Sequence, residues 1–278
     1  MNQTKLIWVL MVGILALVVL DVLLERFGFG DNNIVNLSIK VLPIVLLILH
    51  GALVLGRRRL VYFVLFAFGV GVLFEIIGIK SGVFFGEYYY DKLAGARMYD
   101  VPLIVGAYWS VFIYTGYTIV TSFLVWTNKK KPSISERSSL VLIPFLVVLD
   151  GLVVTAIDLF MDPLRVLNGS WVWVNGGDYF GVPVSNFVGW FVVVIIVTGV
   201  FRLYEYFRPL HRDTGNSGVY IIPLIGYLGI IISFTSSAFA HNLPDLALIG
   251  IAAMLPITVT NVILYINWQI EGGLSNNH

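Results

Sequence analysis

The stretch from Leu60 to Ile79 reads LVYFVLFAFGVGVLFEIIGI and contains one charged residue, Glu75. A helix needs about 20 apolar residues to cross the hydrocarbon core of a bilayer, and this stretch is that long. The second apolar stretch along the chain, Leu37–Leu55, is the weakest candidate for a span because it contains Lys40 and Pro43. Without it, the chain would have seven spans. The sequence therefore predicts an all-α, polytopic membrane helix bundle with about eight transmembrane helices. The remaining stretches are Leu6–Leu24, Leu37–Leu55, Val101–Trp126, Ser139–Phe160, Pro183–Leu203, Val219–Phe239 and Leu246–Trp268.

The composition of the whole chain agrees with a membrane protein. Of its 278 residues, 58% are apolar or aromatic and only 12% are charged. A water-soluble enzyme of this composition could not cover its surface, and the strands of a β-barrel would alternate apolar and polar residues. A net charge of +1 gives no basic surface for nucleic acid, and the absence of cysteine excludes thiolate sites and disulfides. We expect residues 1–278 to form a single integral membrane domain.

Charged residues between the predicted helices set the expected orientation. Basic runs such as Arg57–Arg59 and Lys129–Lys131 lie on one side, which also holds Arg137, Arg202 and Arg212. The positive-inside rule places that side and both termini in the cytoplasm. We therefore expect a multi-pass protein of the plasma membrane. Acids barely affect topology, so their concentration on the outer side points to function there, although outer loops that merely lack basic residues would also fill with acids. Only four of the 16 acids fall on the inner side, namely Glu136, Glu205, Asp213 and Glu271.

Two long outer segments, residues 85–102 and 158–183, share a pattern. Each ends in an aromatic residue, one further residue and Val-Pro, and each is followed by a Trp seven positions after the Pro. These are Pro102 with Trp109, and Pro183 with Trp190. The shared pattern predicts a parallel internal repeat that relates residues 60–126 to residues 139–203.

Acidic side chains lie inside two of the predicted helices. A charged Asp at mid-bilayer costs at least ~2.5–3.5 kcal/mol, so such a residue faces a cavity or has a partner. Asp150 lies near the middle of the fifth span, and Glu75 lies about one turn inside the outer end of the third. Asp162 precedes Pro163 and is expected just beyond the helix that holds Asp158. We expect the four acids to converge on one outer pocket.

Those acids have two interpretations. In the first, they form structural pairs with Arg97, Arg165 or backbone donors. In the second, a carboxyl group buried without a cation stays protonated and acts as a general acid. We favour the second interpretation for Asp158 and Asp150, and weigh the two equally for Glu75 and Asp162.

Motifs for metal and nucleotide chemistry are missing from the sequence. The four histidines form no HxxxH or HxxHH cluster, and there is no GxGxxG or Walker motif. The spacing of Asp158 and Asp162 differs from the NDxxD site with which membrane prenyltransferases hold Mg²⁺-diphosphate. We therefore expect neither a cofactor nor a metal.

Five stretches carry a family resemblance: GEYYYD at 86–91, VP at 101–102, DLFMDP at 158–163, GSWVW at 169–173 and YFGVPVSNFVGW at 179–190. They resemble the CruF-type carotenoid biosynthesis family, whose members are polytopic membrane hydratases. The resemblance covers about residues 60–270, and the segment after Asp158 is its most specific part. It implies addition of water to the terminal C=C bond of a linear carotenoid, which gives a tertiary alcohol. The implied substrates are C40 chains such as γ-carotene or lycopene, or the C50 chain bisanhydrobacterioruberin, which yields bacterioruberin.

The residues themselves agree with this chemistry. Hydration of such an alkene needs a proton donor, a bound water and support for a tertiary carbocation, but no redox cofactor. Asp158 or Asp150 would donate the proton, while Asp162 or Glu75 would hold water with Asn186. The expected partners are a carotenoid taken from the bilayer, the lipid membrane and other carotenoid enzymes. Candidates for contact with the substrate are Glu87, Tyr88, Tyr89, Trp109, Trp171, Trp173, Asn186 and Trp190.

Three other functions compete with hydration. A proton-coupled transporter would suit eight helices with intramembrane acids, but the inner halves of the spans read as apolar apart from His50. A prenyltransferase or elongase of the same pathway is disfavoured because the Asp-rich motifs are missing. A structural or assembly factor is the third alternative.

Overall fold

The computed structural model describes residues 2–27, 32–92, 95–127, 140–209 and 217–275. Within these residues, eight helices are long and apolar enough to cross a membrane, which confirms the all-α polytopic bundle. Among the charged residues used for orientation, Lys129–Lys131, Glu136, Arg137, Arg212 and Asp213 lie outside the described residues. The helices are α1 (Gln3–Arg26), α2 (Asn33–Val54), α3 (Arg57–Ser81), α4 (Leu103–Trp126), α5 (Leu142–Leu167), α6 (Val184–Phe207), α7 (Ile221–Ala240) and α8 (Pro244–Ser275).

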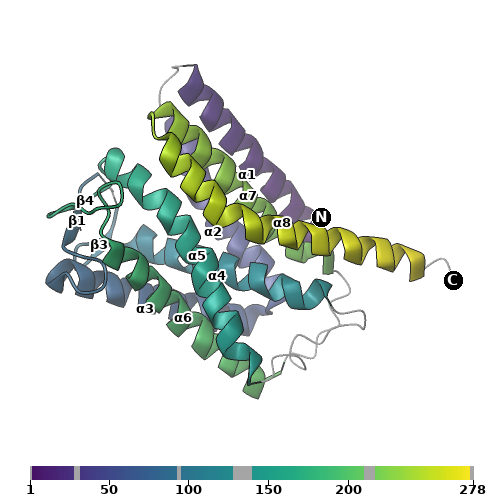
Figure 1. Ribbon diagram of the computed structural model, residues 1–278. Coiled ribbons are helices and arrows are strands. Elements are labelled where there is room, and N and C mark those ends of the chain that lie inside the picture. The colour runs from purple at the N-terminus through teal and green to yellow at the C-terminus, as the bar shows by residue number, and fades with distance from the viewer. Residues whose placement is uncertain (1, 28–31, 93–94, 128–139, 210–216, 276–278) are drawn as a thin grey trace.

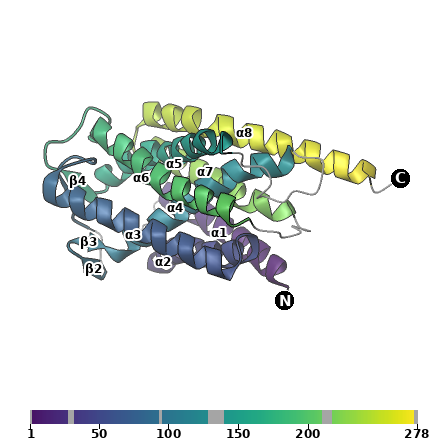
Figure 2. The same ribbon diagram turned by 90° about the horizontal axis from the view of Figure 1, so that it is seen from below.

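Short strands gather at one end of the bundle, and both chain termini lie at the other (Figures 1 and 2). We call these the strand end and the terminal end. β1 (Tyr88–Tyr90) pairs antiparallel with β4 (Trp171–Trp173), and β2 (Arg97–Met98) pairs with β3 (Val101–Pro102). The β1–β4 pair joins the two long segments that the sequence singles out, because one strand comes from each.

The helical hairpins α3–α4 and α5–α6 share the same turn before their second helix. The two central residues of each turn have positive φ: 48° at Tyr99 and 70° at Asp100, and 48° at Phe180 and 87° at Gly181. Positive φ at both central residues is typical of a two-residue β-hairpin. A proline then caps α4 and α6 in extended conformation. The internal repeat stays a prediction, which these shared turns support.

The fifth helix is longer than the sequence suggests. We expected Asp162 to lie beyond its end, but α5 continues to Leu167 and contains Pro163. Because proline lacks an N–H, the carbonyl oxygen of Leu159 loses its usual intrahelical donor. The hydroxyl of Tyr179 donates to this oxygen at 3.0 Å, so the helix continues through the proline. Asp162 therefore stays in the helix, one turn beyond Asp158.

A second helix tolerates its proline in the same way. Pro43 lies inside α2 and removes the donor that Ile39 would otherwise have. The hydroxyl of Tyr108 on α4 lies 3.4 Å from the Ile39 oxygen and 3.2 Å from the Lys40 oxygen, and donates to both. The proline that weakened the second stretch is therefore compatible with a full-length span.

His50 has a related role at the start of α7. Pro223 cannot donate to the carbonyl of Val219, four residues earlier. Nε2 of His50 lies 2.9 Å from that oxygen and donates to it, which leaves Nδ1 to accept from the hydroxyl of Tyr114 at 2.7 Å. This buried histidine thus joins α2, α4 and the start of α7.

Candidate active site

Two aspartates of α5 meet one asparagine of α6 near the strand end. Nδ2 of Asn186 donates to Oδ2 of Asp158 at 2.8 Å and to Oδ2 of Asp162 at 2.7 Å. All three side chains are buried, with 0%, 2% and 3% exposure for Asp158, Asp162 and Asn186. The aspartates are four residues apart and share one helix face, while Pro183 starts α6 so that Asn186 lies in its first turn. We call Asp158 and Asp162 the acid pair.

Each carboxyl group of the acid pair keeps one free oxygen. Within the part of the chain that the structure describes, Oδ1 of Asp158 and Oδ1 of Asp162 have no hydrogen-bond partner. A buried polar atom without a partner is costly, so these atoms call for a proton or a bound water. Two buried carboxylates that share a single amide also repel each other when both are ionised. The acid pair is therefore suited to hold a proton.

Glu75 of α3 has a different environment, because donors occupy both of its oxygens. Nε1 of Trp109 donates to one oxygen at 2.9 Å, and the hydroxyl of Tyr90 donates to the other at 2.6 Å. The hydroxyl of Tyr88 donates to the same oxygen as Tyr90. Strand alternation explains this pair, since Tyr88 and Tyr90 point inward while Tyr89 is 49% exposed. Glu75 thus links α3, α4 and β1.

Three tyrosines outside the membrane-spanning helices remain protonated at neutral pH. Burial raises the pKa of Tyr88 and of Tyr90 well above the ordinary value, and the charge of Glu75 raises both further. Burial and the charge of Asp158 raise the pKa of Tyr179 to about 12. These phenols therefore act as hydrogen-bond donors to the groups they contact.

Aromatic rings surround the acids. The rings of Trp109 and Trp190, one from each hairpin, lie with centroids 4.1 Å apart. On the β1–β4 pair, Tyr88 lies 5.7 Å from Trp173 and Tyr90 lies 5.9 Å from Trp171. The indole rings therefore line one end of the site.

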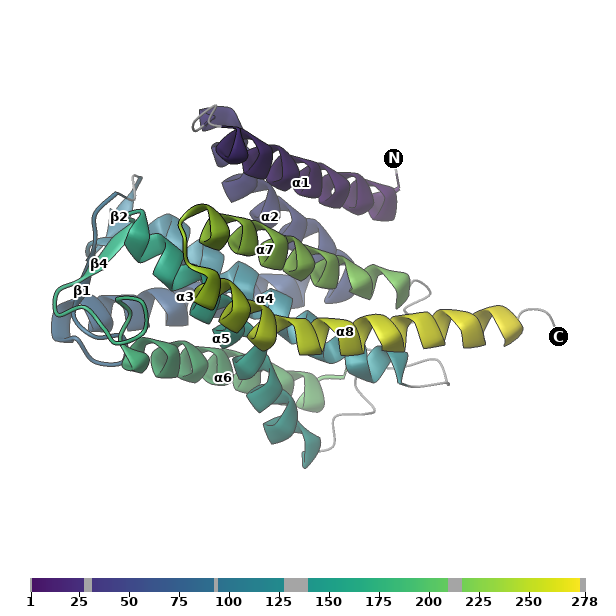
Figure 3. The ribbon, with the colours of Figure 1, turned by 45° about the horizontal axis from the view of Figure 1, so that its top comes forward.

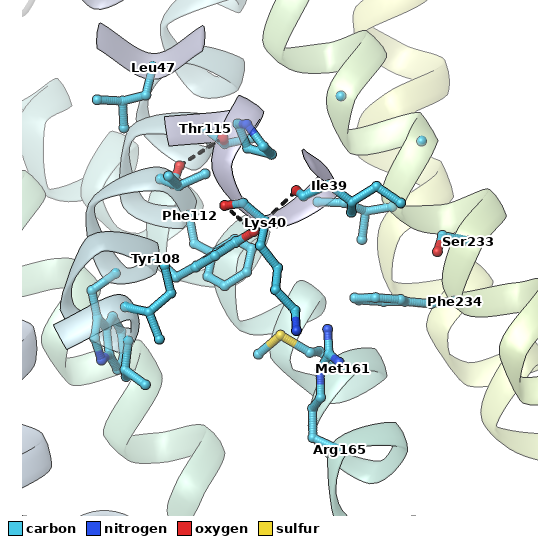
Figure 4. Close-up of a pocket in the computed structure, with 18 of the residues that line it drawn as sticks. Ile39, Lys40, Leu47, Tyr108, Phe112, Thr115, Met161, Arg165, Ser233 and Phe234 are labelled. Carbon is cyan, nitrogen blue, oxygen red and sulfur yellow. Dashed lines mark hydrogen bonds between the residues drawn. The ribbon is translucent and has the colours of Figure 1, made fainter. Parts of the chain in front are cut away.

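A cavity of about 670 Å³ begins at these residues and continues among α1, α2, α4 and α7. Its volume is in the range of pockets that hold a small molecule. Asp162 lines it, whereas Asp158 lies behind Asp162. Figure 4 shows Lys40 of α2 and Arg165 of α5 pointing toward one another beside Met161, and both cations line the cavity. Arg165 also interacts electrostatically with Asp162 and with Asp21 of α1.

The structure brings most of the predicted residues together. Glu75 lies within electrostatic range of both aspartates of the acid pair. Glu87 and Tyr89 are exposed and do not line the cavity. Arg165 is one of the partners expected for the acids, and it does interact electrostatically with Asp162. Sequence reasoning missed Lys40 as a cavity residue, although it stands out as a charge inside an apolar stretch. Eight predicted residues do line the cavity: Glu75, Tyr88, Trp109, Asp162, Trp171, Trp173, Asn186 and Trp190.

Asp150 lies apart from the other three acids. Arg202 of α6 donates to it through Nε at 2.7 Å and through Nη2 at 2.6 Å. The Arg202 guanidinium also lies 4.6 Å from the ring centroid of Tyr117, whose hydroxyl donates to Glu205 at 2.6 Å. The inner halves of the spans are therefore less apolar than the sequence suggests. The sequence does carry a signal for this pair, because Arg202 is a basic residue that lies inside α6, five positions before the end of the helix.

The partner of Asp150 is neither of the two arginines, Arg97 and Arg165, that the sequence suggests as partners of the acids. Arg202, which we expected only to set the orientation, forms this buried ion pair. Arg97 donates to the backbone oxygens of Tyr90 and Asp100.

Comparisons with known proteins point to one family. A family model described as "Carotenoid biosynthesis protein" matches residues 35–257, which is most of the chain. The match includes the acid pair, Glu75, both long segments and every cavity wall except α1. Neither the curated proteins nor the solved structures include a match to the chain.

Proposed function

The chain belongs to the carotenoid biosynthesis protein family, and we propose that it is a hydratase that adds water to the terminal C=C bond of a linear carotenoid. The product is a tertiary alcohol, and the reaction neither oxidises nor reduces the substrate. Candidate substrates are C40 chains such as lycopene or γ-carotene, and C50 bisanhydrobacterioruberin. Membership of the family supports a role in carotenoid biosynthesis, and the chemistry of the site supports this reaction within it.

One observation carries the proposal. Among the described residues, an acid pair with two unpartnered oxygens lies at the aromatic-lined end of a large and mostly apolar cavity, which Asp162 lines. Protonation of an alkene requires a strong acid at an apolar surface, and a positioned general acid contributes about 10²–10⁴-fold to such a step. An apolar cavity with a single acidic end therefore suits a long hydrocarbon whose end group reacts.

The proton transfer begins with the carboxyl group that faces the cavity. In the proposed mechanism, the acid pair holds one proton, and Asp162 delivers it to the carbon of the double bond that bears one hydrogen. The second carbon becomes a tertiary carbocation. Asn186 keeps both carboxyl groups in place throughout, because its single amide nitrogen bonds to both. Asp158 takes part by sharing the proton and the remaining charge.

Water addition completes the reaction. The faces of Trp109 and Trp190 stabilise the cation, and such contacts are worth ~2 kcal/mol or more in a site without water. A water molecule bonds to the tertiary carbon through its oxygen and gives up one proton to the carboxylate. The acid pair is thereby restored, and the sum of the steps is substrate plus water.

Pigment analysis in cells tests the proposal. Cells that make lycopene or a C50 precursor are given the gene, and the carotenoids are analysed by mass spectrometry. We expect a gain of one water mass for each reacted end group. In deuterated water the product should also carry one deuterium bonded to carbon beside the new alcohol carbon. Unchanged pigments with every precursor would contradict the proposal.

A proton-coupled transporter is the main alternative. The Asp150–Arg202 pair and His50 show that polar groups extend beyond the strand end, as a carrier requires. However, Arg202 bonds to both oxygens of Asp150, and both ring nitrogens of His50 are bonded. Transport of a carotenoid or proton by purified protein in vesicles, without any change in pigment mass, would favour the carrier.

The remaining alternative within the pathway is a prenyltransferase or elongase. Such an enzyme would lengthen the carbon chain of the pigment instead of adding water, so the same mass analysis separates the two reactions. Association with other carotenoid enzymes is a further proposal, for which co-purification from pigment-producing cells is the test.

A further inference from the structure

The cavity continues well beyond the acid pair toward the terminal end. Along α7 its wall extends from Phe234, level with Met161 and Arg165 in Figure 4, to Gly226 and Ile222. Eight residues separate Phe234 from Gly226, which corresponds to ~12 Å along a helix. The cavity is therefore deeper than the end group of a carotenoid requires. The lining of this deeper part is mostly apolar and includes the polar side chains of His50 and Tyr114.

α1 closes this deep part of the cavity. It packs against α2 and α7, while α2 and α7 themselves make little direct contact. Figure 3 shows α1 at the edge of the bundle, above α2 and α7. Met11 and Leu15 of α1 line the cavity on this side. α1 is also the one cavity wall outside the region that matches the family.

Gly226 leaves space at the point where α7 faces α1. A Cβ atom at this position would meet only the Cε atom of Met11, at an ordinary contact distance of 3.7 Å. α7 is also held from a neighbouring direction, because the hydroxyl of the next residue, Tyr227, donates to the Val153 carbonyl of α5 at 3.0 Å. The size of the space beside Gly226 therefore depends on the fixed position of α7 and on the flexible side chain of Met11.

We propose that Gly226 is a specificity-determining residue, because its missing side chain lets the apolar chain of the substrate extend from the acid pair toward the terminal end. This inference rests on the proposed function and adds to it the direction in which the chain lies. The ligand is an extended, narrow hydrocarbon chain. Its reacting end lies among the indoles. A bulky residue at position 226 would exclude a long chain and still admit a short one with the same end group.

The test compares pigment bound by purified variants. Each protein is purified in detergent from lycopene-producing cells, and the lycopene retained per protein is measured by absorbance. A bulky side chain in the path of the bound chain should weaken its binding, so Gly226→Phe should lower retention about tenfold, which corresponds to about 1.4 kcal/mol. Gly226→Ala should retain pigment as wild type does, since its Cβ has room. Gly69→Phe is the matched control, because a Cβ at Gly69 meets nothing within 4 Å.

A compensating change guards against mere misfolding. Gly226→Leu should also lower lycopene retention. Met11→Ala removes the atom that faces position 226, so adding it to Gly226→Leu should restore most of the lost retention. Hydration of a truncated terpenoid with the same end group should be equal in wild type and Gly226→Phe. Equal lycopene retention by wild type and Gly226→Phe would overturn the inference. If wild type binds lycopene without hydrating it while Gly226→Phe does not bind, the proposed reaction fails and the inference stands.

Discussion

Glu75 and Asp158 each lie 14 residues before the middle residue of the strand that follows, Tyr89 for Glu75 and Val172 for Asp158. Those two middle residues face each other in the β1–β4 register. The two acids thus occupy corresponding places in the two hairpins, yet their surroundings differ. Glu75 accepts from three donors, whereas Asp158 shares one amide with Asp162 and keeps a free oxygen. Donors therefore occupy both oxygens of one acid, whereas within the described residues the other acid keeps one oxygen without a partner.

The bond between Tyr179 and the Leu159 carbonyl should depend on Pro163. Tyr179→Phe leaves that buried carbonyl without its donor, and we expect a loss of about 1–3 kcal/mol in the free energy of unfolding. In the Pro163→Ala background the new N–H takes the place of the hydroxyl, so the same change should cost much less. Thermal unfolding of the four proteins in one detergent measures this coupling. Equal costs in both backgrounds would show that the hydroxyl does not replace the missing donor.

The Asp150–Arg202 pair should matter for stability and not for the reaction. Asp150→Asn or Arg202→Gln alone leaves a buried charge unpaired, which typically costs about 3–5 kcal/mol. The double variant removes both charges and should recover much of that loss. We expect its hydration rate per folded protein to equal that of wild type. A folded Asp150→Asn protein with no activity would instead assign the chemistry to Asp150.

Alkaline pH should weaken the fold through Tyr179. Its pKa is about 12 in the folded protein, against an ordinary value of about 10 in the unfolded chain. Below the lower value the phenol is neutral in both states, so its contribution to stability is fully present. As the pH rises through this window, the unfolded phenol ionises first and that contribution is lost. Unfolding midpoints of wild type should therefore fall more steeply across the window than those of Tyr179→Phe, and parallel curves would contradict the assignment.

The orientation of the bundle is open to direct labelling, because the chain contains no cysteine. Tyr89 is 49% exposed on β1 at the strand end, so Tyr89→Cys introduces a single accessible thiol. If the strand end faces away from the cytoplasm, a membrane-impermeant maleimide should label it in intact cells. A cysteine at Arg58, at the start of α3 on the terminal end, should react only after lysis. The reverse labelling pattern would overturn the expected topology.

Apolar length alone predicts the eight helices well, because a bilayer demands continuous apolar runs of fixed length. The sequence also points to Asp158, Asp162 and Asn186, since polar groups inside such runs need a reason. It does not reveal that Asp162 stays helical, because the donor to Leu159 comes from Tyr179, far along the chain. Likewise, Arg202 reads as a topology signal until α5 and α6 are placed side by side. Pairings between distant helices are what the linear pattern leaves undetermined.

Hydration by variants of the acid pair tests the central claim most directly. Asp162→Asn is nearly the same size as aspartate, but it cannot give a proton to the substrate. We expect Asp162→Asn to lower the yield of hydrated carotenoid at least about 100-fold, in line with the loss of a general acid. Asp158→Asn should also lower it, whereas the Asp150→Asn/Arg202→Gln protein serves as a control with an intact acid pair. Full conversion of lycopene or a C50 precursor by folded Asp162→Asn would contradict the account.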